Sequence, residues 1–505
     1  MTQQDQNQLM ETAKTIADQF KLPENGYLQK TVEEYVKQSL HGLAHQDPVG
    51  IPMLPSFVSS MPTGKEKGTF LALDLGGTNF RVCLVKLLGN SKHTIDQIKE
   101  AVNPEIMASD MKTFISHLGD RIVSFLEIYY QSFLEQCAHD PESTPELKAG
   151  FTFSFPLHQT AVNRGTLIRW TKGYSINDAV GKDILQALQQ ELDSRGLRLH
   201  LTAVINDTVG TLLTRSYSKP VGCGPTIIGC IFGTGTNGAY SEPLANITKL
   251  GAEELAHVAP GKDSMVINTE WGAFDNALKV IPNCKYDKLL DANTPNPGFH
   301  MFEKRVSGMF LGELLRIIMV ELHDAGLLFT TNEALEALKY PSPAHAKDGK
   351  TQNALRVPWS MNTAVPATLD GESNNNNNNN NNNNDDFTHS RKIMYEHLGF
   401  EPNQDELAAL SVIACAIGKR AAYLSAVPLA GAVLHSRALE RFDTIDVGAD
   451  GSVIEHYPRF QEMIFEALEQ TELGSKGVAR ITMGIAKDGS GVGAALCALE
   501  AEGCL

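Results

Sequence analysis

Two stretches, residues 70–79 (FLALDLGGTN) and 227–237 (IIGCIFGTGTN), decide the fold of this 505-residue chain. Each is an apolar run of strand length that ends in a turn rich in glycine and threonine, and a second apolar run follows each turn. Glycines let backbone N–H groups approach an anion closely, so both turns are candidate phosphate loops. Because this strand–turn–strand pattern occurs twice, it predicts a duplicated α/β domain that binds a ligand between its two copies.

Strand and helix patterns alternate before, between and after the two loops. Residues 8–40 carry apolar positions at helical spacing on both sides of a turn at 23–26, and they predict two helices ahead of the first loop. Further strands are predicted at 149–156 and 199–206, and further helices at 110–134, 181–195, 301–322, 332–338, 405–426 and 459–468. This alternation is typical of an α/β fold.

Composition and charge exclude several classes of protein. The formal net charge is −16, and the sequence lacks the basic stripe that is typical of nucleic-acid binding, so we expect no nucleic-acid partner. The apolar stretch 412–434 is interrupted by Lys419, Arg420 and Pro428, which favours a buried helix pair over a membrane span. Eight cysteines without a CxxC pair predict reduced thiols and a cytoplasmic location.

An unbroken run of asparagine fills residues 374–384, flanked by Glu372, Asp385 and Asp386. The run offers no apolar side chain for burial, so we expect a disordered surface loop over 371–386. Its composition fits either a loop expansion that the fold tolerates or a prion-like segment. We favour the loop expansion, because lengthening a surface loop costs little free energy.

Three glycine-rich stretches are candidates for nucleotide binding. Residues 233–238 match the GxGxxG spacing of dinucleotide-binding loops, but residues 239–243 continue as strand where that fingerprint requires a helix, so we reject the Rossmann interpretation. At the first loop, Asp74 would lie next to phosphates, where a carboxylate requires a divalent cation, directly or through water. A plain hairpin turn is the alternative. Residues 488–493 (DGSGVG) open a C-terminal helix as an anion cradle or as a tight turn.

Asp207, at the end of the predicted strand 199–206, is the candidate general base. Open α/β sheets bind their ligands at the carboxyl ends of strands. A hydroxyl group that attacks phosphorus must give up its proton, and a carboxylate at this place can accept it. The alternative is an Asx turn or a helix cap at the start of 209–216.

Several polar residues lie among aromatic or apolar neighbours, as a sugar pocket requires. Ser154 lies in FSFP (153–156), and Thr171 and Lys172 lie in WTKG (170–173). Glu270 and Glu303 could each accept hydrogen bonds from two adjacent hydroxyls of a hexose. Taken singly, the lysine could be an ordinary surface residue and the acids ordinary helix-face or capping residues.

Taken together, these motifs resemble the hexokinase family, and within it the fungal glucokinase branch. The resemblance rests on LALDLGGTNFRV, GFTFSFP, LIRWTKG, INDTVGTL, GTGTN, INTEWGAFDN, NPGFHMFEKRVSGMFLGE and DGSGVGAALCAL, which occur in the family's order. It covers nearly the whole chain from about residue 28 to 499, except the asparagine run. It implies the duplicated actin-like ATPase (ribonuclease H-like) fold, with two lobes around a cleft.

The resemblance also implies the role of each site residue. The catalytic residues would be Asp207 as the base and Lys172. The sugar would contact Ser154, Thr171, Lys172, Asn206, Asp207, Asn237, Glu270 and Glu303. The nucleotide would contact Asp74, Leu75, Gly76, Gly77, Thr78, Asn79, Thr234, Gly308 and Ser490. No protein side chain would bind a metal directly, because Mg²⁺ would arrive with ATP and reach Asp74 through water.

The implied domain organisation has four segments. We expect an N-terminal helical segment at 1–68 that packs on the large lobe, a small lobe at 69–207, a large lobe at 208–484, and a C-terminal loop and helix at 485–505 that return to the small lobe. We expect a monomer or a homodimer.

The implied activity is transfer of the γ-phosphoryl group of MgATP to the 6-hydroxyl of glucose. The alternatives are a broader hexokinase, an N-acetylglucosamine kinase and a non-catalytic sugar sensor. His300 stands where many hexokinases carry Gln, and Tyr174 stands where Phe often follows WTKG. Both departures flank sugar contacts, so they bear on whether a ketose is accepted.

Overall fold

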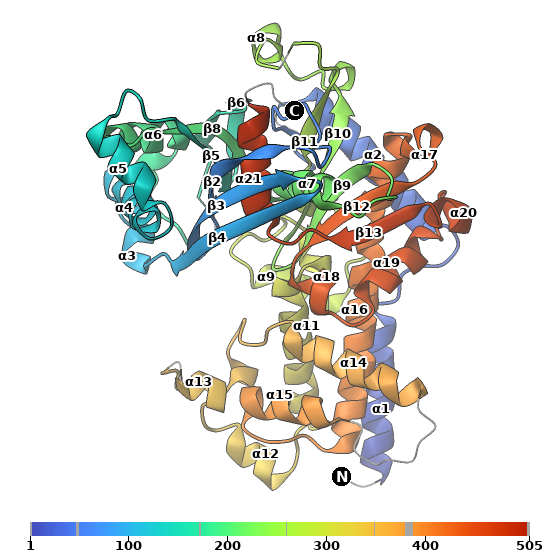
Figure 1. Ribbon diagram of the computed structural model, residues 1–505. Helices are drawn as coiled ribbons and strands as arrows, with labels where there is room; N and C mark the ends of the chain where they lie inside the picture. The colour runs from blue at the N-terminus through green and yellow to red at the C-terminus, as the bar shows by residue number, and fades with distance from the viewer. Residues whose placement is uncertain are drawn as a thin grey trace.

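The computed structural model describes residues 3–46, 50–170, 173–258, 260–347, 349–378 and 387–501. Its strands form two main sheets, each at the centre of one lobe (Figure 1). The small-lobe sheet has the order β4 (Lys92–Ala101), β3 (Asn79–Gly89), β2 (Lys67–Leu75), β5 (Leu147–Phe153), β8 (Leu199–Ile205). The large-lobe sheet has the order β1 (Leu54–Pro55), β11 (Ser264–Asn268), β10 (Thr236–Pro243), β9 (Thr226–Phe232), β12 (Ile445–Asp450), β13 (Ile481–Ile485).

The two sheets repeat one topology, which confirms the predicted duplication. In the small lobe, β2 pairs antiparallel with β3 and parallel with β5, and β5 pairs parallel with β8. In the large lobe, β9 pairs antiparallel with β10 and parallel with β12, and β12 pairs parallel with β13. Because β10 continues as a strand directly after the GTGT turn, the rejection of a dinucleotide-binding helix there is also confirmed.

Helices of the small lobe pack on the face of its sheet away from the large lobe (Figure 1). The predicted helix at 110–134 is two helices, α4 (Met111–Tyr129) and α5 (Gln131–His139), which break at Tyr130. Asp110 and Asp183 cap α4 and α6 (Ile184–Ser194) by accepting backbone N–H bonds. The lobe also contains α3 (Pro104–Met107), β6 (Leu157–Ala161) and β7 (Arg164–Leu167).

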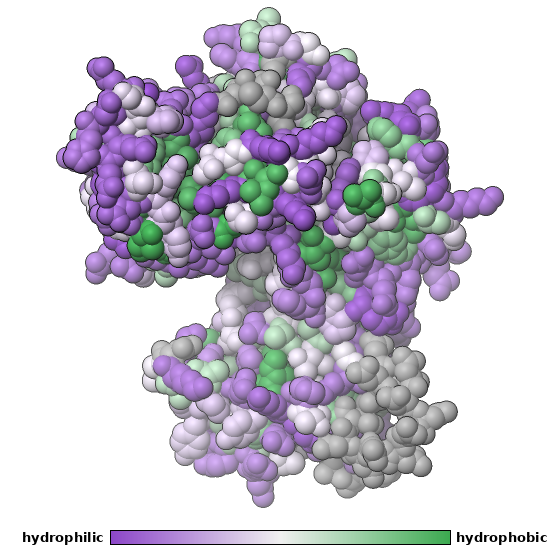
Figure 2. Space-filling view, in the orientation of Figure 1, coloured by the Kyte–Doolittle hydropathy of each residue, from purple (hydrophilic) through white to green (hydrophobic). Residues whose placement is uncertain are grey.

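Most of the remaining helices belong to the large lobe, and several extend below its sheet into a lower helical part (Figure 1). The N-terminal helices α1 (Gln3–Asp18) and α2 (Tyr27–Ala44) share a hydrophobic core with this lobe through Leu9 and Tyr35, and Phe20 in the turn after α1 joins the same core. Figure 2 shows a largely hydrophilic face with a narrowing above the lower part. The further helices are α8 (Ala252–Leu255), α9 (Lys285–Ala292), α10 (Glu303–Val306), α11 (Gly308–Asp324), α12 (Asn332–Ala337), α13 (Pro343–Lys347), α15 (Thr388–Leu398), α17 (Ala438–Arg441), α18 (Ser452–His456), α19 (Phe460–Leu468) and α20 (Gly474–Val478).

The apolar stretch 412–434 lies in one long helix, α16 (Gln404–His435), so the predicted helix pair is wrong. Pro428 lies inside this helix, where it removes one backbone hydrogen bond. Close packing on neighbouring helices keeps the helix continuous, and Ala426, Val427 and Leu429 are almost fully buried. By length and composition α16 could cross a membrane, but 67% of its apolar window is buried inside the protein.

The predicted loop at 371–386 begins later than expected, because helix α14 runs from Ala364 to Asn378. The start of α14 is anchored by the buried Val365 and Leu369. Extending an anchored helix adds one backbone hydrogen bond per residue, so the first asparagines continue it despite their modest helix propensity. Residues 379–386 lie outside the described residues.

Two helices cross between the lobes. Helix α7 (Asp207–Ser218) leads from the small-lobe sheet, and α21 (Gly489–Glu500) lies at the centre of Figure 1 between the two sheets. Their backbones approach so closely that a Cβ at Gly493 would lie 2.2 Å from the Cα of Gly210. Buried side chains from both helices and from β2 and β3 form one hydrophobic cluster at this junction.

Candidate active site

The carboxyl ends of three neighbouring strands form the small-lobe side of the site. Asp74 on β2 is in register with Thr152 on β5, and Thr152 is in register with Ile205 on β8. The residues that follow, Ser154 after β5 and Asn206 after β8, therefore lie at one edge of the sheet. Parallel strands place their carboxyl ends together in this way, which is why such edges carry ligand sites.

Asp207 is the first residue of α7, and Asn206 is its N-cap. The Asn206 Oδ1 accepts hydrogen bonds from the Thr208 backbone N–H at 2.9 Å and from its hydroxyl at 2.6 Å. Asn206 thus fills the N-cap position that sequence reasoning offered for Asp207, while the Asp207 Oδ1 also accepts the Thr208 backbone N–H at 2.9 Å. The half-buried Asp207 carboxylate lies at the same strand edge as Ser154.

A hydrogen-bonded cluster joins three predicted sugar residues across the two lobes. The Asn237 Nδ2 on β10 lies 3.0 Å from Glu270 Oε1 and 3.4 Å from Asn206 Oδ1. Asn268, which sequence reasoning did not assign, accepts from Asn237 at 2.8 Å and donates to Glu270 at 2.8 Å. Glu270 has a left-handed backbone with φ of 54°, a strained conformation that is held by this network.

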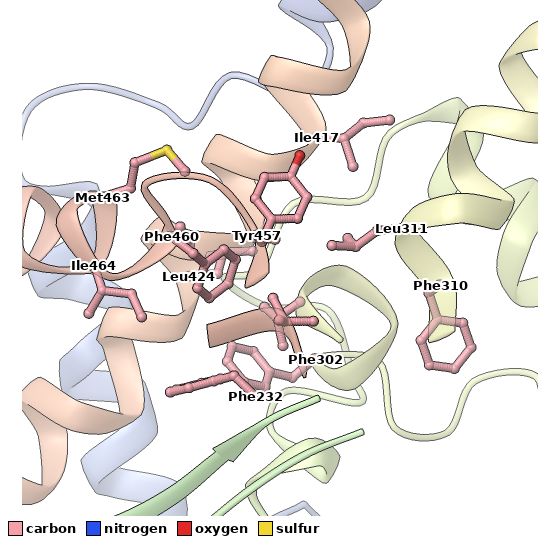
Figure 3. Close-up of a cluster of buried hydrophobic side chains, with 14 of the residues drawn as sticks. Phe232, Phe302, Phe310, Leu311, Ile417, Leu424, Tyr457, Phe460, Met463 and Ile464 are labelled. Carbon is pink, nitrogen blue, oxygen red and sulfur yellow. The ribbon is translucent and has the colours of Figure 1, made fainter. Parts of the chain in front are cut away.

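Glu303 lies on the other side of the GTGT turn. Its Oε2 accepts the backbone N–H of Thr236 at 3.0 Å, and its Oε1 lies 3.2 Å from His300 Nδ1. The preceding Phe302 is fully buried next to Phe232, the last residue of β9, in the hydrophobic cluster of Figure 3. The hydrophobic core therefore fixes the positions of both the carboxylate and the turn.

The first glycine loop is closed by a hydrogen bond from the Gly76 N–H to the Asn79 carbonyl at 3.0 Å. Next to it, Asp74 accepts from Arg81 at 2.8 Å, and Arg81 Nη1 lies 3.4 Å from Asp488 Oδ1. Arg81 was not predicted as a site residue. It connects the first glycine loop to the loop that opens α21, and both loops were predicted to contact the nucleotide.

The second glycine loop contacts the start of α11. The Gly308 N–H donates to the Gly233 carbonyl at 2.8 Å, and the Met309 N–H donates to the backbone carbonyl of the exposed Thr234 at 3.2 Å. The predicted nucleotide residues Thr234 and Gly308 are therefore neighbours. The backbone carbonyl of Ser490 accepts the Thr152 hydroxyl at 2.8 Å, which brings the first turn of α21 to the small-lobe strand edge.

Asp450, at the end of β12, is a candidate nucleotide residue that sequence reasoning missed. Gly451 follows it and lies against the second glycine loop, since a Cβ there would be 2.6 Å from the Phe232 carbonyl. Burial raises the pKa of the Asp450 carboxyl to about 6. The sequence does contain a signal for this residue, because residues 445–451 repeat the pattern of an apolar strand that ends in an acidic residue and glycine.

Three predictions from the sequence require a restricted interpretation. Thr171 and Lys172 lie outside the described residues. The side chain of Leu75 is fully buried, so only its backbone can face a nucleotide. The Tyr174 ring is also buried and stacks on Trp170 at 5.2 Å between centroids, so it can affect the sugar only through the packing of this segment.

The carboxylates Asp74, Asp207, Asp450 and Asp488 are spread over separate strand ends and loops. In the part of the chain that the structure describes, no group of three or more His, Cys, Asp or Glu side chains could enclose a metal ion. The site instead offers single acids next to glycine loops.

Comparisons with known proteins give one consistent result. Two family models, both described as hexokinase, match residues 12–217 and 227–500. The chain is 42% identical to a glucokinase of Aspergillus niger, an alignment that covers 98% of this chain and 97% of that relative. It is 40% identical to glucokinase-1 of Saccharomyces cerevisiae, with coverage of 90% and 88%. It is 35% identical to hexokinase-1 of the same yeast, with coverage of 98% and 93%.

The similarity extends to solved structures. A Schistosoma mansoni hexokinase complexed with glucose matches with a TM-score of 0.76 and 30% identity, covering 98% of this chain and 99% of that one. The chain belongs to the hexokinase family and has its actin-like ATPase fold.

Proposed function

We propose that this protein is a glucokinase, which transfers the γ-phosphoryl group of ATP to the 6-hydroxyl of glucose and yields glucose 6-phosphate and ADP. One observation carries the proposal. The hydrogen-bonded set Asn206, Asn237 and Glu270 adjoins Asp207, so polar groups that suit ring hydroxyls lie next to a carboxylate that can accept a proton. The names of two relatives, both glucokinases, and of a glucose-bound hexokinase structure support glucose as the acceptor.

In the proposed reaction, Asp207 accepts the proton of the 6-hydroxyl while that oxygen attacks the γ-phosphorus in line. Asn206, Asn237, Glu270 and Glu303 hold the sugar hydroxyls and fix the direction of attack. Backbone N–H groups of the two glycine loops face the phosphates and stabilise negative charge in the transition state. The part assigned to Lys172 rests on the WTKG motif alone.

Magnesium is proposed to reach the site with ATP. When bound, it would neutralise charge on the phosphate oxygens. Asp74 fits a contact through water, because it is a single carboxylate whose Oδ2 is already engaged by Arg81. The residues of this chain then have the task of holding the phosphates and excluding water, which would otherwise compete with the sugar as acceptor.

An acceptor panel tests the proposal directly. We expect glucose to give the highest kcat/KM with MgATP, and fructose to fall lower by roughly 10² to 10⁴, because a furanose leaves partly buried acceptors such as Glu270 and Glu303 without hydroxyl partners. Comparable values for glucose and fructose would replace glucokinase by a broader hexokinase. If N-acetylglucosamine were the best acceptor, the protein would be an N-acetylglucosamine kinase. Glucose binding without ADP formation would indicate a sugar sensor.

We also propose a cytoplasmic location. The cysteines within the described residues, Cys83, Cys137, Cys223, Cys230, Cys284, Cys415 and Cys497, form no disulfide bonds, as is typical of a reducing compartment. Fluorescence microscopy of a tagged chain, compared with a cytoplasmic marker, tests this proposal, and an organellar pattern would contradict it.

A further inference from the structure

A contact between the two lobes lies next to the proposed sugar site. The Arg169 guanidinium, which follows β7 in the small lobe, lies over the ring of Phe299, which precedes α10 in the large lobe. The guanidinium carbon is 5.8 Å from the ring centroid, within the range of a cation–π interaction. Phe299 is 46% exposed, so its ring is available to a partner from the opposite lobe. Arg169 immediately precedes the WTKG motif.

The contact continues from Phe299 to His300. The two rings stack with centroids 5.3 Å apart and planes inclined by 20°. His300 has a left-handed backbone with φ of 52°, which is rare for a residue other than glycine. The hydrogen bond from the Lys304 N–H to the His300 carbonyl, at 3.1 Å, ties this turn to α10.

His300 in turn contacts the sugar-binding carboxylate. Its Nδ1 lies 3.2 Å from Glu303 Oε1, while Thr236 donates its backbone N–H to Glu303 Oε2. A carboxylate held at both oxygens has a fixed plane, so the directions in which it accepts hydroxyl hydrogens are fixed as well. A shift of the His300 ring would rotate that plane and change which sugar hydroxyls find a partner.

We propose that Arg169, Phe299 and His300 form an interlobe latch that positions Glu303 for glucose, so that these three residues set the KM for glucose and the preference for glucose over fructose. This inference rests on the proposed role of Glu303 as a sugar acceptor. The three are positioning residues, because they act through the orientation of Glu303. The latch couples the approach of the lobes to the shape of the sugar site.

The first test compares disruptive with conservative variants at two positions. Phe299→Ala removes the contacts with Arg169 and His300, and His300→Ala removes the stack on Phe299 and the hydrogen bond to Glu303. We expect each to raise the glucose KM roughly three- to tenfold, the size of one lost cation–π contact or hydrogen bond, with kcat changed less than about twofold. Phe299→Tyr keeps the ring and should stay near the unmodified enzyme. His300→Gln keeps an N–H donor without the stack and should fall between the enzyme and His300→Ala.

The second test is a double-mutant cycle for the interlobe contact. Arg169→Gln combined with Phe299→Ala should raise the glucose KM no more than Phe299→Ala alone, because Arg169 acts on the sugar site only through the Phe299 ring. Arg164→Gln, at an exposed arginine on β7, is the matched control and should leave KM unchanged. Thermal unfolding of each variant, expected within about 2 °C of the unmodified enzyme, separates positioning from loss of stability.

The outcomes distinguish the latch from the proposed function. An enzyme that does not phosphorylate glucose, in its unmodified form or as Arg164→Gln, would contradict the proposed function itself. An active enzyme whose glucose KM and fructose preference are unchanged by Phe299→Ala and His300→Ala would overturn the latch alone. Strictly additive effects of Arg169→Gln and Phe299→Ala would likewise overturn the coupling between the lobes.

Discussion

At the scale of single residues, the sugar side of the cleft leaves little free space around Glu303. Gly235 lies so close that a Cβ there would be 2.8 Å from Glu303 Oε2. The clashing atom is the end of a flexible side chain, so the backbone need not move. A larger residue at this position would instead displace the carboxylate from its place between Thr236 and His300.

Gly235→Ala should therefore impair the sugar site while sparing the fold. We expect kcat/KM for glucose to fall roughly tenfold, as one acceptor hydrogen bond is lost, and the unfolding temperature to change by less than about 2 °C. Gly251→Ala is a suitable control, because the nearest atom to a Cβ there lies 3.7 Å away. Unchanged kinetics in Gly235→Ala would mean that the position of Glu303 is unimportant.

Glu500 is a second residue with a testable consequence, at the end of α21. Its Oε1 accepts the backbone N–H groups of Ser59 and Ser60, in the connection that leads to the small lobe, whereas Oε2 has no hydrogen-bond partner among the described residues. Burial raises the pKa of this carboxyl from 4.5 to about 7. The folded protein therefore holds this proton more tightly than the unfolded chain.

The sign of the pH effect follows from that shift. The contribution of Glu500 to stability is fully present below about pH 4.5 and is lost as the pH rises to about 7, by about 3 kcal/mol. Glu500→Gln removes this titration and should be more stable than the unmodified protein at pH 8 but not at pH 4.5. Denaturant unfolding at both pH values measures the difference, and a difference that does not vary with pH would contradict the shift.

At the scale of elements, the crossing of α7 and α21 joins the two ends of the active site. Helix α7 begins with Asp207, and α21 begins next to Ser490, while Gly210 and Gly493 bring their backbones together. A side chain at this crossing must push the helices apart. The separation would move the proposed base relative to the C-terminal loop.

Gly493→Ala should accordingly reduce both stability and turnover. We expect a loss of about 1–3 kcal/mol in the free energy of unfolding, as for overpacking in a core, together with a lower kcat. Gly491→Ala on the same helix is the matched control, since a Cβ there meets only the Cys83 Sγ at 3.5 Å. Equal effects of the two substitutions, in denaturant unfolding and in kcat, would contradict the role assigned to the crossing.

The elements that the sequence predicted well have strong local signals. The apolar runs before the two glycine loops, at 70–75 and 227–232, lie on strands that pair as expected. The exceptions depend on neighbours that are distant in sequence. Pro428 remains inside α16 because the surrounding packing keeps that helix continuous, and α14 extends into the asparagine run from a buried start.

The residues of the active site also divide into those with a local sequence signal and those whose role depends on distant neighbours. Its strand-end and loop residues, among them Asn206, Asn237 and Glu270, were identified from motifs, and the structure brings these three into one hydrogen-bonded group. Arg81 and Asp450 were missed, because their relation to the glycine loops depends on sheet order and interlobe packing. For Asp450 the sequence does carry a signal, since residues 445–451 repeat the pattern of an apolar strand that ends in an acidic residue and glycine, but the contact with the second glycine loop follows only from the packing.

At the scale of the whole molecule, the active site depends on both lobes at once. The small lobe supplies Asp74 and Asp207 at its strand edge, and the large lobe supplies Asn237, Glu270 and Glu303. The buried cluster around α7 and α21 connects the two sheets. Neither lobe alone contains both the proposed base Asp207 and the sugar-binding carboxylates Glu270 and Glu303, so the activity should require the intact pair.

The central claim is that Asp207 accepts the proton of the sugar hydroxyl in this cleft. Its most direct measurement compares glucose binding, by calorimetry, with glucose-dependent ADP formation in Asp207→Ala, using Asp193→Asn at an exposed position as the control. We expect Asp207→Ala to bind glucose with an affinity within roughly threefold of the unmodified enzyme while its kcat falls by about 10²-fold or more. The control variant should keep both values. Near-normal turnover in Asp207→Ala would show that Asp207 is not the proton acceptor.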